Sequence, residues 1–388
     1  MRMRLGCLLA GFAAAALASS ALAQAPLQIT PPAKAPRASP PKAAPKPPAR
    51  KPAAKKPTQR PTQPPTQPPT EDQVWPSPPD QAQPVPAPSA APAEPRLAMP
   101  VAPAQPSLAF AFDAYQRGFY VQAFAEATRV ASEKSDPKAM ALLGELYANG
   151  QGTALDLKKA ASWFQLAAER GDPAGTFALA LLHLGTRGGP RDLATAIKYL
   201  EAATKLGHPT AAYDLGLLYL GGQQVAQDFA RAAELFRRAA DAGVPEAQYA
   251  LATLHKEGRG VAKDPVEAAR LLAAASRAQN LDAMVEYAIV LFNGTGVAKD
   301  EAGAAALMGK AARRGSPIAQ NRYARVLAAG RGIASSPTQA TKWHTIAKAG
   351  GVSDTWLDEF VAKLSPAERA AGEAAAKPWL EAIAQSRP

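Results

Sequence analysis

Residues 136–171 read DPKAMALLGELYANGQGTALDLKKAASWFQLAAERG, and the same pattern returns every 36 residues until Gly351. It contains a proline, a small residue, an aromatic or histidine, paired glycines, an aspartate and regularly spaced alanines. No residue is inserted or lost between the six copies. A fixed period of this length predicts an array of helix pairs, an α-solenoid, and therefore an all-α fold.

The repeated positions have physical roles in two consecutive helices. Proline at the first turn, as at Pro137, starts the first helix, because that turn's N–H groups have no partner within the helix. Glycines such as Gly150 end it by adopting a positive φ, and Asp156 caps the second helix. Alanines seven residues apart, as at Ala160 and Ala167, form one face of that second helix. Small residues in the first helix let the second approach closely. They are Gly144, Ala180, Gly216, Ala252, Ala288 and Ala324.

The segment from Ala139 to Gly171 resembles the Sel1-like repeat, through Ala-x-x-x-Leu-Gly-x-x-Tyr, a Gly-x-Gly loop, an aspartate and a late Ala-Ala pair. The resemblance covers residues 136–351 and implies a right-handed superhelix of antiparallel helix pairs, related to the tetratricopeptide repeat. It also implies binding of other proteins. The last two copies depart from the pattern, with Leu291 and Leu327 at the aromatic position and Ser336 at the aspartate position.

The N-terminal 23 residues have the pattern of a secretory signal peptide. Two arginines precede an apolar run, and Ala21-Leu22-Ala23 resembles a cleavage site. We expect cleavage after Ala23, no membrane span in the mature chain, and a periplasmic or secreted location. Cleavage also removes Cys7, the single cysteine, so the array must be held by packing without disulfides.

Residues 24–106 form a linker rich in proline, alanine and lysine, which we expect to be disordered. The tail from Lys34 to Arg60 holds nine lysines or arginines and no acidic residue. Such a tail can attract peptidoglycan or another anionic envelope polymer, or it can be a solvated spacer. The export signal and the lack of interleaved aromatics argue against nucleic acid as a partner.

Two segments flank the repeats and are expected to cap the array. Residues 107–135 contain apolar positions on either side of Gly118 that predict a helix pair. Residues 352–388 predict amphipathic helices, the second beginning after Ser365. Exposed ends of a solenoid aggregate, so caps are needed there.

No pattern of catalytic residues is present, and the sequence predicts a protein that is not an enzyme and has no cofactor or metal. The four histidines are His183, His208, His255 and His344, and no two have the spacing of a metal-binding helix motif. His183 and His255 occupy the aromatic position of the repeat, where a packing role is favoured over a role in pH sensing or metal binding.

Alignment with the related tetratricopeptide repeat places one stripe of first-helix residues on the inner face of the superhelix. The stripe is apolar in the second and third repeats and becomes polar toward the C-terminal end. It predicts either a partner-binding groove or an apolar seam that only seals the repeats together. The candidate binding residues are Phe177, Leu181, Tyr213, Leu217, Tyr249, Lys256, Phe292, Asn321 and Arg325.

These features together predict an exported scaffold or regulator that binds a partner protein of the cell envelope in this groove. The alternative is an envelope-anchoring protein, whose basic tail binds the polymer while the solenoid remains passive.

Overall fold

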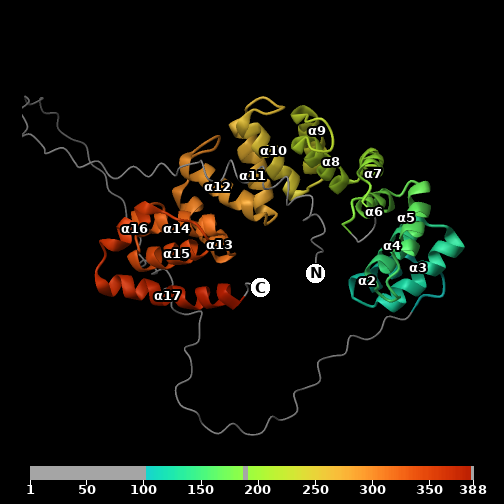
Figure 1. Ribbon diagram of the computed structural model, residues 1–388, viewed down its shortest axis with the longest axis horizontal. Helices are drawn as coiled ribbons and strands as arrows, with labels where there is room; N and C mark the ends of the chain where they lie inside the picture. The colour runs from blue at the N-terminus through green and yellow to red at the C-terminus, as the bar shows by residue number, and fades with distance from the viewer. Residues whose placement is uncertain (1–101, 187–190, 386–388) are drawn as a thin grey trace, which may run out of the picture. The chain divides into compact units, whose positions relative to one another are not determined.

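The computed structural model describes residues 102–186 and 191–385 of the 388-residue chain. Within these ranges the protein consists of sixteen helices without strands, following one another in chain order from cyan α2 to red α17 (Figure 1). The all-α prediction is thereby confirmed. The expected signal peptide, nearly all of the linker and the last three residues lie outside the described residues. No helix in the described part is long and apolar enough to cross a membrane.

The helices of the repeats alternate between a first member, here called helix A, and a second member, helix B. The six A helices are α4 (Pro137–Asn149), α6 (Pro173–His183), α8 (Pro209–Gly221), α10 (Pro245–Glu257), α12 (Leu281–Asn293) and α14 (Pro317–Ala329). The B helices are α5 (Leu157–Glu169), α7 (Leu193–Lys205), α9 (Phe229–Asp241), α11 (Pro265–Arg277), α13 (Glu301–Arg313) and α15 (Pro337–Ala349). Each A helix packs against the B helix of its repeat, and each B helix from α5 to α13 also packs against the A helix of the next repeat.

Capping of the B helices follows the prediction. Asp156 accepts a hydrogen bond from the backbone N–H of Lys159 at 2.9 Å, and Asp228 accepts one from Arg231 at 2.9 Å. At the last repeat, Ser336 Oγ accepts from the Gln339 N–H at 3.4 Å. Serine therefore keeps the capping role of aspartate in this repeat, at a longer distance.

Five of the six A helices also have side-chain caps, which the repeat pattern did not predict, whereas α10 follows Val244 and has none. Asp136, Asp172, Asn280 and Ser316 each accept a hydrogen bond from a first-turn N–H. His208 takes this position at α8 through its ring Nδ1. These side chains satisfy donors that a helix cannot satisfy by itself.

Within a repeat, the size of the small residue on helix A matches the size of the residue that helix B places against it. A Cβ on Gly144 would overlap the ring of Phe164, and a Cβ on Gly216 would overlap the ring of Phe236. In the other four repeats the A position is alanine, and the B position twenty residues later is leucine, methionine or histidine. Glycine therefore occurs where phenylalanine must fit, which keeps the helix pairs closely packed.

The second glycine of the Gly-x-Gly loop joins consecutive repeats. A side chain at Gly152 would strike the backbone of Tyr120, which begins the helix Tyr120–Lys134 before the repeats. One at Gly260 would strike Phe229 at the start of α9. Gly296 and Gly332 lie against the backbone of Pro265 and Glu301 in the same way. Each of these glycines also has a positive φ. They are therefore required both by the turn and by the contact with the previous helix B.

Helices α2 (Leu108–Gln116) and α3 (Tyr120–Lys134) precede the repeats, with Gly118 at φ 83° between them. The chain is already held on α3 a few residues before the expected end of the linker. Arg129 donates hydrogen bonds to the carbonyls of Pro103 and Ala104. Lys134 donates to the carbonyl of Pro106 at 2.6 Å. The boundary of the linker at residue 106 stays a prediction.

Helices α16 (Thr355–Ala362) and α17 (Pro366–Gln385) follow the last repeat. The long helix α17 packs against α15, where Gly372 lies directly on Thr341 and Trp379 contacts Trp343. The buried side chains of α14, α15, α16 and α17 belong to one apolar cluster. Assignment of α2–α3 and α16–α17 as caps stays a prediction, because no measurement compares the array with and without them.

The matched sizes at Gly216 and Phe236 predict a coupled pair of substitutions. Gly216→Ala should destabilise the array by about 1–2 kcal/mol, since the added methyl group overpacks against the ring while the helix itself gains up to about 1 kcal/mol. Phe236→Leu should cost on the order of 1 kcal/mol by loss of apolar volume. The double variant recreates the Ala252 and Leu272 pair of the next repeat. Its loss of stability should be smaller than the sum of the losses in the two single variants. Urea unfolding followed by circular dichroism measures all four proteins, and additive effects would contradict the matching.

Candidate partner-binding site

The nine predicted binding residues lie on helices α6, α8, α10, α12 and α14, and we call this set the A-helix stripe. The structure divides the set by exposure. Five of its side chains are buried, and four keep part of their surface exposed. The prediction that the stripe binds a partner is not tested by this geometry, but the environment of each residue limits what it can contribute.

The buried members pack within the protein's own core. Leu217 and Phe292 are 2% and 1% exposed, and Leu181 and Tyr213 are nearly as buried. The ring of Tyr213 lies 5.7 Å from that of Phe236, between centroids. Their positions correspond to the sealing role that the sequence left open for the apolar part of the stripe. Asn321 is also buried, and it has a polar partner described below.

Phe177 is half-buried and stacks on His208, with ring centroids 4.3 Å apart. His208 Nδ1 accepts a hydrogen bond from the Ala211 N–H at 3.1 Å, which requires an unprotonated nitrogen. Burial lowers the pKa of His208 to about 4. The histidine is therefore neutral near pH 7, and it acts as a helix cap and an aromatic neighbour of Phe177.

Tyr249 and Lys256 lie on α10, close to the buried carboxylate of Glu286 on α12. Lys256 Nζ is 2.9 Å from Glu286 Oε2 of α12, and the glutamate side chain is only 4% exposed. Burial, together with the negative charges of Glu286, Asp282 and Glu257, raises the pKa of Tyr249 above its usual range. The tyrosine hydroxyl therefore stays protonated, and the lysine is held in place by its ion pair.

Arg325 forms the strongest polar contact of the stripe. Its Nε and Nη2 atoms lie 2.5 and 2.7 Å from the two carboxylate oxygens of Asp354, and Asn321 Nδ2 donates to the same carboxylate at 2.8 Å. Asp354 also caps α16. Burial alone would raise the pKa of Asp354, but the hydrogen bonds from Arg325 and Asn321 outweigh it and lower that pKa. The arginine stacks over Trp356 at 5.2 Å, so one network joins α14 to α16.

Asp354 and Glu286 were not among the predicted site residues, and neither was Asp214 of α8. Asp214 and Glu286 occupy the same repeat position, two repeats apart. Glu286 is paired with Lys256 of the preceding repeat. The equivalent residue in the repeat that precedes Asp214 is Leu184, which cannot form an ion pair. Among the described residues, Asp214 forms no ion pair, and its Oδ1 has no hydrogen-bond donor. It is an acid buried without compensation. Register comparison between repeats is the signal that finds it.

The histidines occupy separate surroundings. His183 stacks on Tyr199 at 5.6 Å, His255 is buried with Nδ1 3.3 Å from the Ala262 carbonyl, and His344 Nε2 lies 2.9 Å from Asp358 Oδ1. In residues 102–186 and 191–385, no three side chains of the His, Cys, Asp or Glu type are placed to hold a metal ion together. These contacts are packing and ion-pair contacts within the fold.

Comparison with protein families identifies the repeats. The family model described as Sel1 repeat matches residues 137–172, 173–208, 209–244, 245–280, 281–316 and 317–352. These matches cover more than half of the chain, and the protein belongs to the Sel1 repeat family. Proteins of this family are in general non-enzymatic scaffolds for protein interactions. A search of curated proteins gives no match.

Two solved structures are similar to the chain over the repeats. One is a protective antigen of uropathogenic Escherichia coli with an SLR fold, at 25% identity and a TM-score of 0.56. The match covers 66% of this chain and 56% of the antigen, so it spans little more than half of that protein. The other is a Sel1 repeat protein from Oxalobacter formigenes, at 25% identity and a TM-score of 0.55, with 63% of this chain and all of that chain covered.

The buried acid Asp214 predicts a specific pH dependence of stability. Burial raises its pKa from 3.8 to about 7. Between these values the folded protein holds one proton more than the unfolded chain, so this group lowers stability as the pH rises. Asp214→Asn should therefore be more stable than the parent at pH 8, by up to about 4 kcal/mol. At pH 4 the two proteins should be nearly equal.

Urea unfolding at a series of pH values measures this difference. Asp228→Asn is a control for the loss of one aspartate, because Asp228 is exposed at a helix cap. A stability difference between Asp214→Asn and the parent that does not change from pH 4 to pH 8 would contradict the buried, protonated state of Asp214.

Proposed function

We propose that this Sel1 repeat protein is an exported scaffold or regulator that binds a partner protein through the A-helix stripe. The observation that carries the proposal is the exposure pattern of the stripe. Phe177, Tyr249, Lys256 and Arg325 keep side-chain surface while the buried members hold the repeats together. The partner would contact these four residues, with the apolar members serving as the support beneath them.

The part of the stripe from α10 to α14 suits a binding surface best, because its charged groups are held in fixed positions. Lys256 is fixed by Glu286 and Arg325 by Asp354, each at hydrogen-bond distance. A side chain already held in its bound conformation loses less entropy when a partner arrives. Arginine and tyrosine are also the residues most often found at the energetic centre of protein interfaces. The surface therefore combines an aromatic and two cations on a rigid support.

Export is part of the same proposal. The apolar run after Arg2 and Arg4 and the Ala-Leu-Ala sequence before Gln24 support cleavage after Ala23 and a periplasmic or secreted location. The partner would then be a protein of the cell envelope. We propose no reaction or cofactor for this chain, since its repeats supply a binding surface and the sequence contains no catalytic motif.

A second candidate function is envelope anchoring through the tail from Lys34 to Arg60. The nine basic residues of this tail, unbroken by any acid, favour attraction to peptidoglycan or another anionic polymer. In this case the repeats would be a passive body, and binding would weaken with salt.

The scaffold proposal predicts that substitutions on the stripe remove a partner without unfolding the array. The mature chain from Gln24 is used to capture proteins from a periplasmic extract, beside the variants Tyr249→Ser and Lys256→Ala. Each variant should lower capture of the same partner at least about fivefold, the effect of losing roughly 1 kcal/mol of interface energy. Mass spectrometry quantifies the captured protein.

Arg237→Ala provides the matched control, because Arg237 is exposed on helix B α9 and lies outside the stripe. Circular dichroism checks that all variants remain folded. Equal capture by parent and stripe variants would contradict the proposed surface. Cosedimentation of the full mature chain with sacculi, abolished by deletion of residues 34–60 and by salt, would favour the anchoring function instead.

A further inference from the structure

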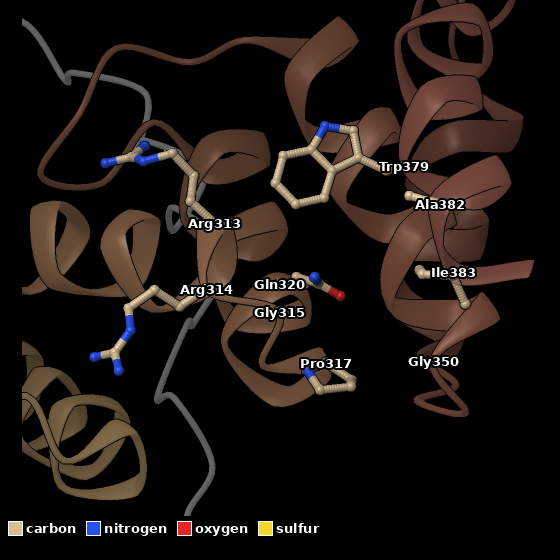
Figure 2. Close-up of a pocket in the computed structure, with 9 residues that line it drawn as sticks. All are labelled: Arg313, Arg314, Gly315, Pro317, Gln320, Gly350, Trp379, Ala382 and Ile383. Carbon is tan, nitrogen blue, oxygen red and sulfur yellow. The ribbon is translucent and has the colours of Figure 1, made fainter. Parts of the chain in front are cut away.

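A pocket lined by none of the nine residues of the A-helix stripe lies at the C-terminal end of the array. It has a volume of about 490 Å³ and is formed by the turn from α13 to α14, the end of α15 and one face of α17. Figure 2 shows Trp379, Ala382 and Ile383 of α17 on one side, with Pro317 and Gln320 of α14 facing them. A pocket of this volume is large enough for a side chain together with its neighbouring peptide groups.

Two arginines line one side of this pocket. In Figure 2 the side chains of Arg313 and Arg314 begin at the α13 side, and their charged ends point away from Trp379. Arg314 donates a hydrogen bond to the Gln279 carbonyl at 3.0 Å, and no carboxylate of the described residues pairs with Arg313. Lys342 of α15 is close enough that the charge of Arg313, after burial, contributes to lowering its pKa. Arg313 and Lys342 are thus like charges close to each other, and within the described part of the chain neither forms an ion pair, which is unfavourable without an anion.

The wall formed by α17 is aromatic and apolar. Trp379 meets Trp343 edge to face, at 5.2 Å between ring centroids, and Lys342 Nζ lies 4.9 and 5.6 Å from the centroids of Trp343 and Trp379. Trp379 and Ile383 are both half-buried, so each keeps surface that faces the pocket. The lysine is therefore held over two indole rings, while the apolar surface below it is available to a ligand.

We infer that this pocket is a docking site for an acidic protein segment that carries one large apolar side chain. The apolar side chain would lie against Trp379, Ala382 and Ile383, and the carboxylates beside it would pair with Arg313 and Lys342. Pairing would remove the repulsion between these two cations, so binding gains from charge complementarity as well as from apolar burial. This site is independent of the A-helix stripe, and it gives the scaffold a second surface with a different preference.

The charge of the site decides among possible occupants. A basic or proline-rich segment would add like charge next to Arg313 and Arg314 and would be disfavoured. A purely apolar segment would leave the cations unpaired. An anionic lipid surface shares the required charge, but the pocket lies between helices and its apolar wall faces Pro317 and Gln320, which favours a single inserted side chain (Figure 2).

Fluorescence anisotropy with a labelled peptide tests the inference. The probe is Asp-Glu-Phe-Asp-Glu with blocked ends, and the protein is the mature chain from Gln24. We expect saturable binding that weakens about tenfold when Arg313 is changed to Glu, since one attractive contact becomes repulsive. Ala382→Glu, at an exposed position inside the pocket, should weaken binding to a similar extent.

Arg277→Glu is the matched control, because Arg277 ends α11 at the repeat position of Arg313 and is equally exposed. It alters the net charge by the same amount and should leave peptide affinity nearly unchanged. Replacement of the probe phenylalanine by alanine should weaken binding to the parent protein. Equal loss in Arg277→Glu and Arg313→Glu, or no saturable binding, would overturn the inference. Arg313-dependent binding to phosphatidylglycerol vesicles without binding of the peptide would overturn it in favour of a lipid surface.

Discussion

The close approach of the two helices in each repeat is the constraint on which the rest of the structure depends. That approach is set by one position on helix A, which is glycine where helix B presents phenylalanine and alanine where it presents a smaller or more flexible residue. A second close contact, between Gly152 or its equivalents and the preceding helix B, fixes the step from repeat to repeat. Since the expected mature chain has no cysteine, no disulfide can replace these contacts. Small residues at fixed spacing therefore determine both the packing of each helix pair and the step from one repeat to the next.

This constraint also explains where functional side chains can occur. Positions that face the neighbouring repeat must remain apolar, and Leu217 and Phe292 are accordingly buried. The two charged members of the stripe are each paired with a carboxylate two helices further along the chain. Lys256 of α10 pairs with Glu286 of α12, and Arg325 of α14 pairs with Asp354 at the start of α16. Asp214 of α8, which is not a member of the stripe, has no such partner, and burial raises its pKa. We therefore expect the proposed binding surfaces at the partly exposed members of the stripe and at the C-terminal end, where α17 departs from the repeat pattern.

Much of the fold could be predicted from the sequence because the period multiplies weak local signals. Proline starts, glycine ends and aspartate caps each recur in register, and the structure has helices at those places. The exposure of the stripe could not be predicted, because it depends on how closely neighbouring A helices approach. Phe177 and Leu181 look equivalent in sequence, yet Phe177 is only half-buried and stacks on His208, whereas Leu181 is buried. The pocket beside Trp379 was missed for a related reason: α17 has no register relation to the repeats, so nothing in the pattern indicates which residues it faces.

Hydrogen–deuterium exchange of the mature chain, alone and with its captured partner, tests the central claim most directly, namely that partner binding occurs on the polar part of the A-helix stripe. The account predicts slower exchange on binding in α10, α12, α14 and the start of α16, where Lys256 pairs with Glu286 and Arg325 pairs with Asp354. Helices α5 and α7 should keep the exchange rates of the free protein. Slowing confined to the B helices, or to the segment before residue 102, would contradict the account and place the binding surface elsewhere on the chain.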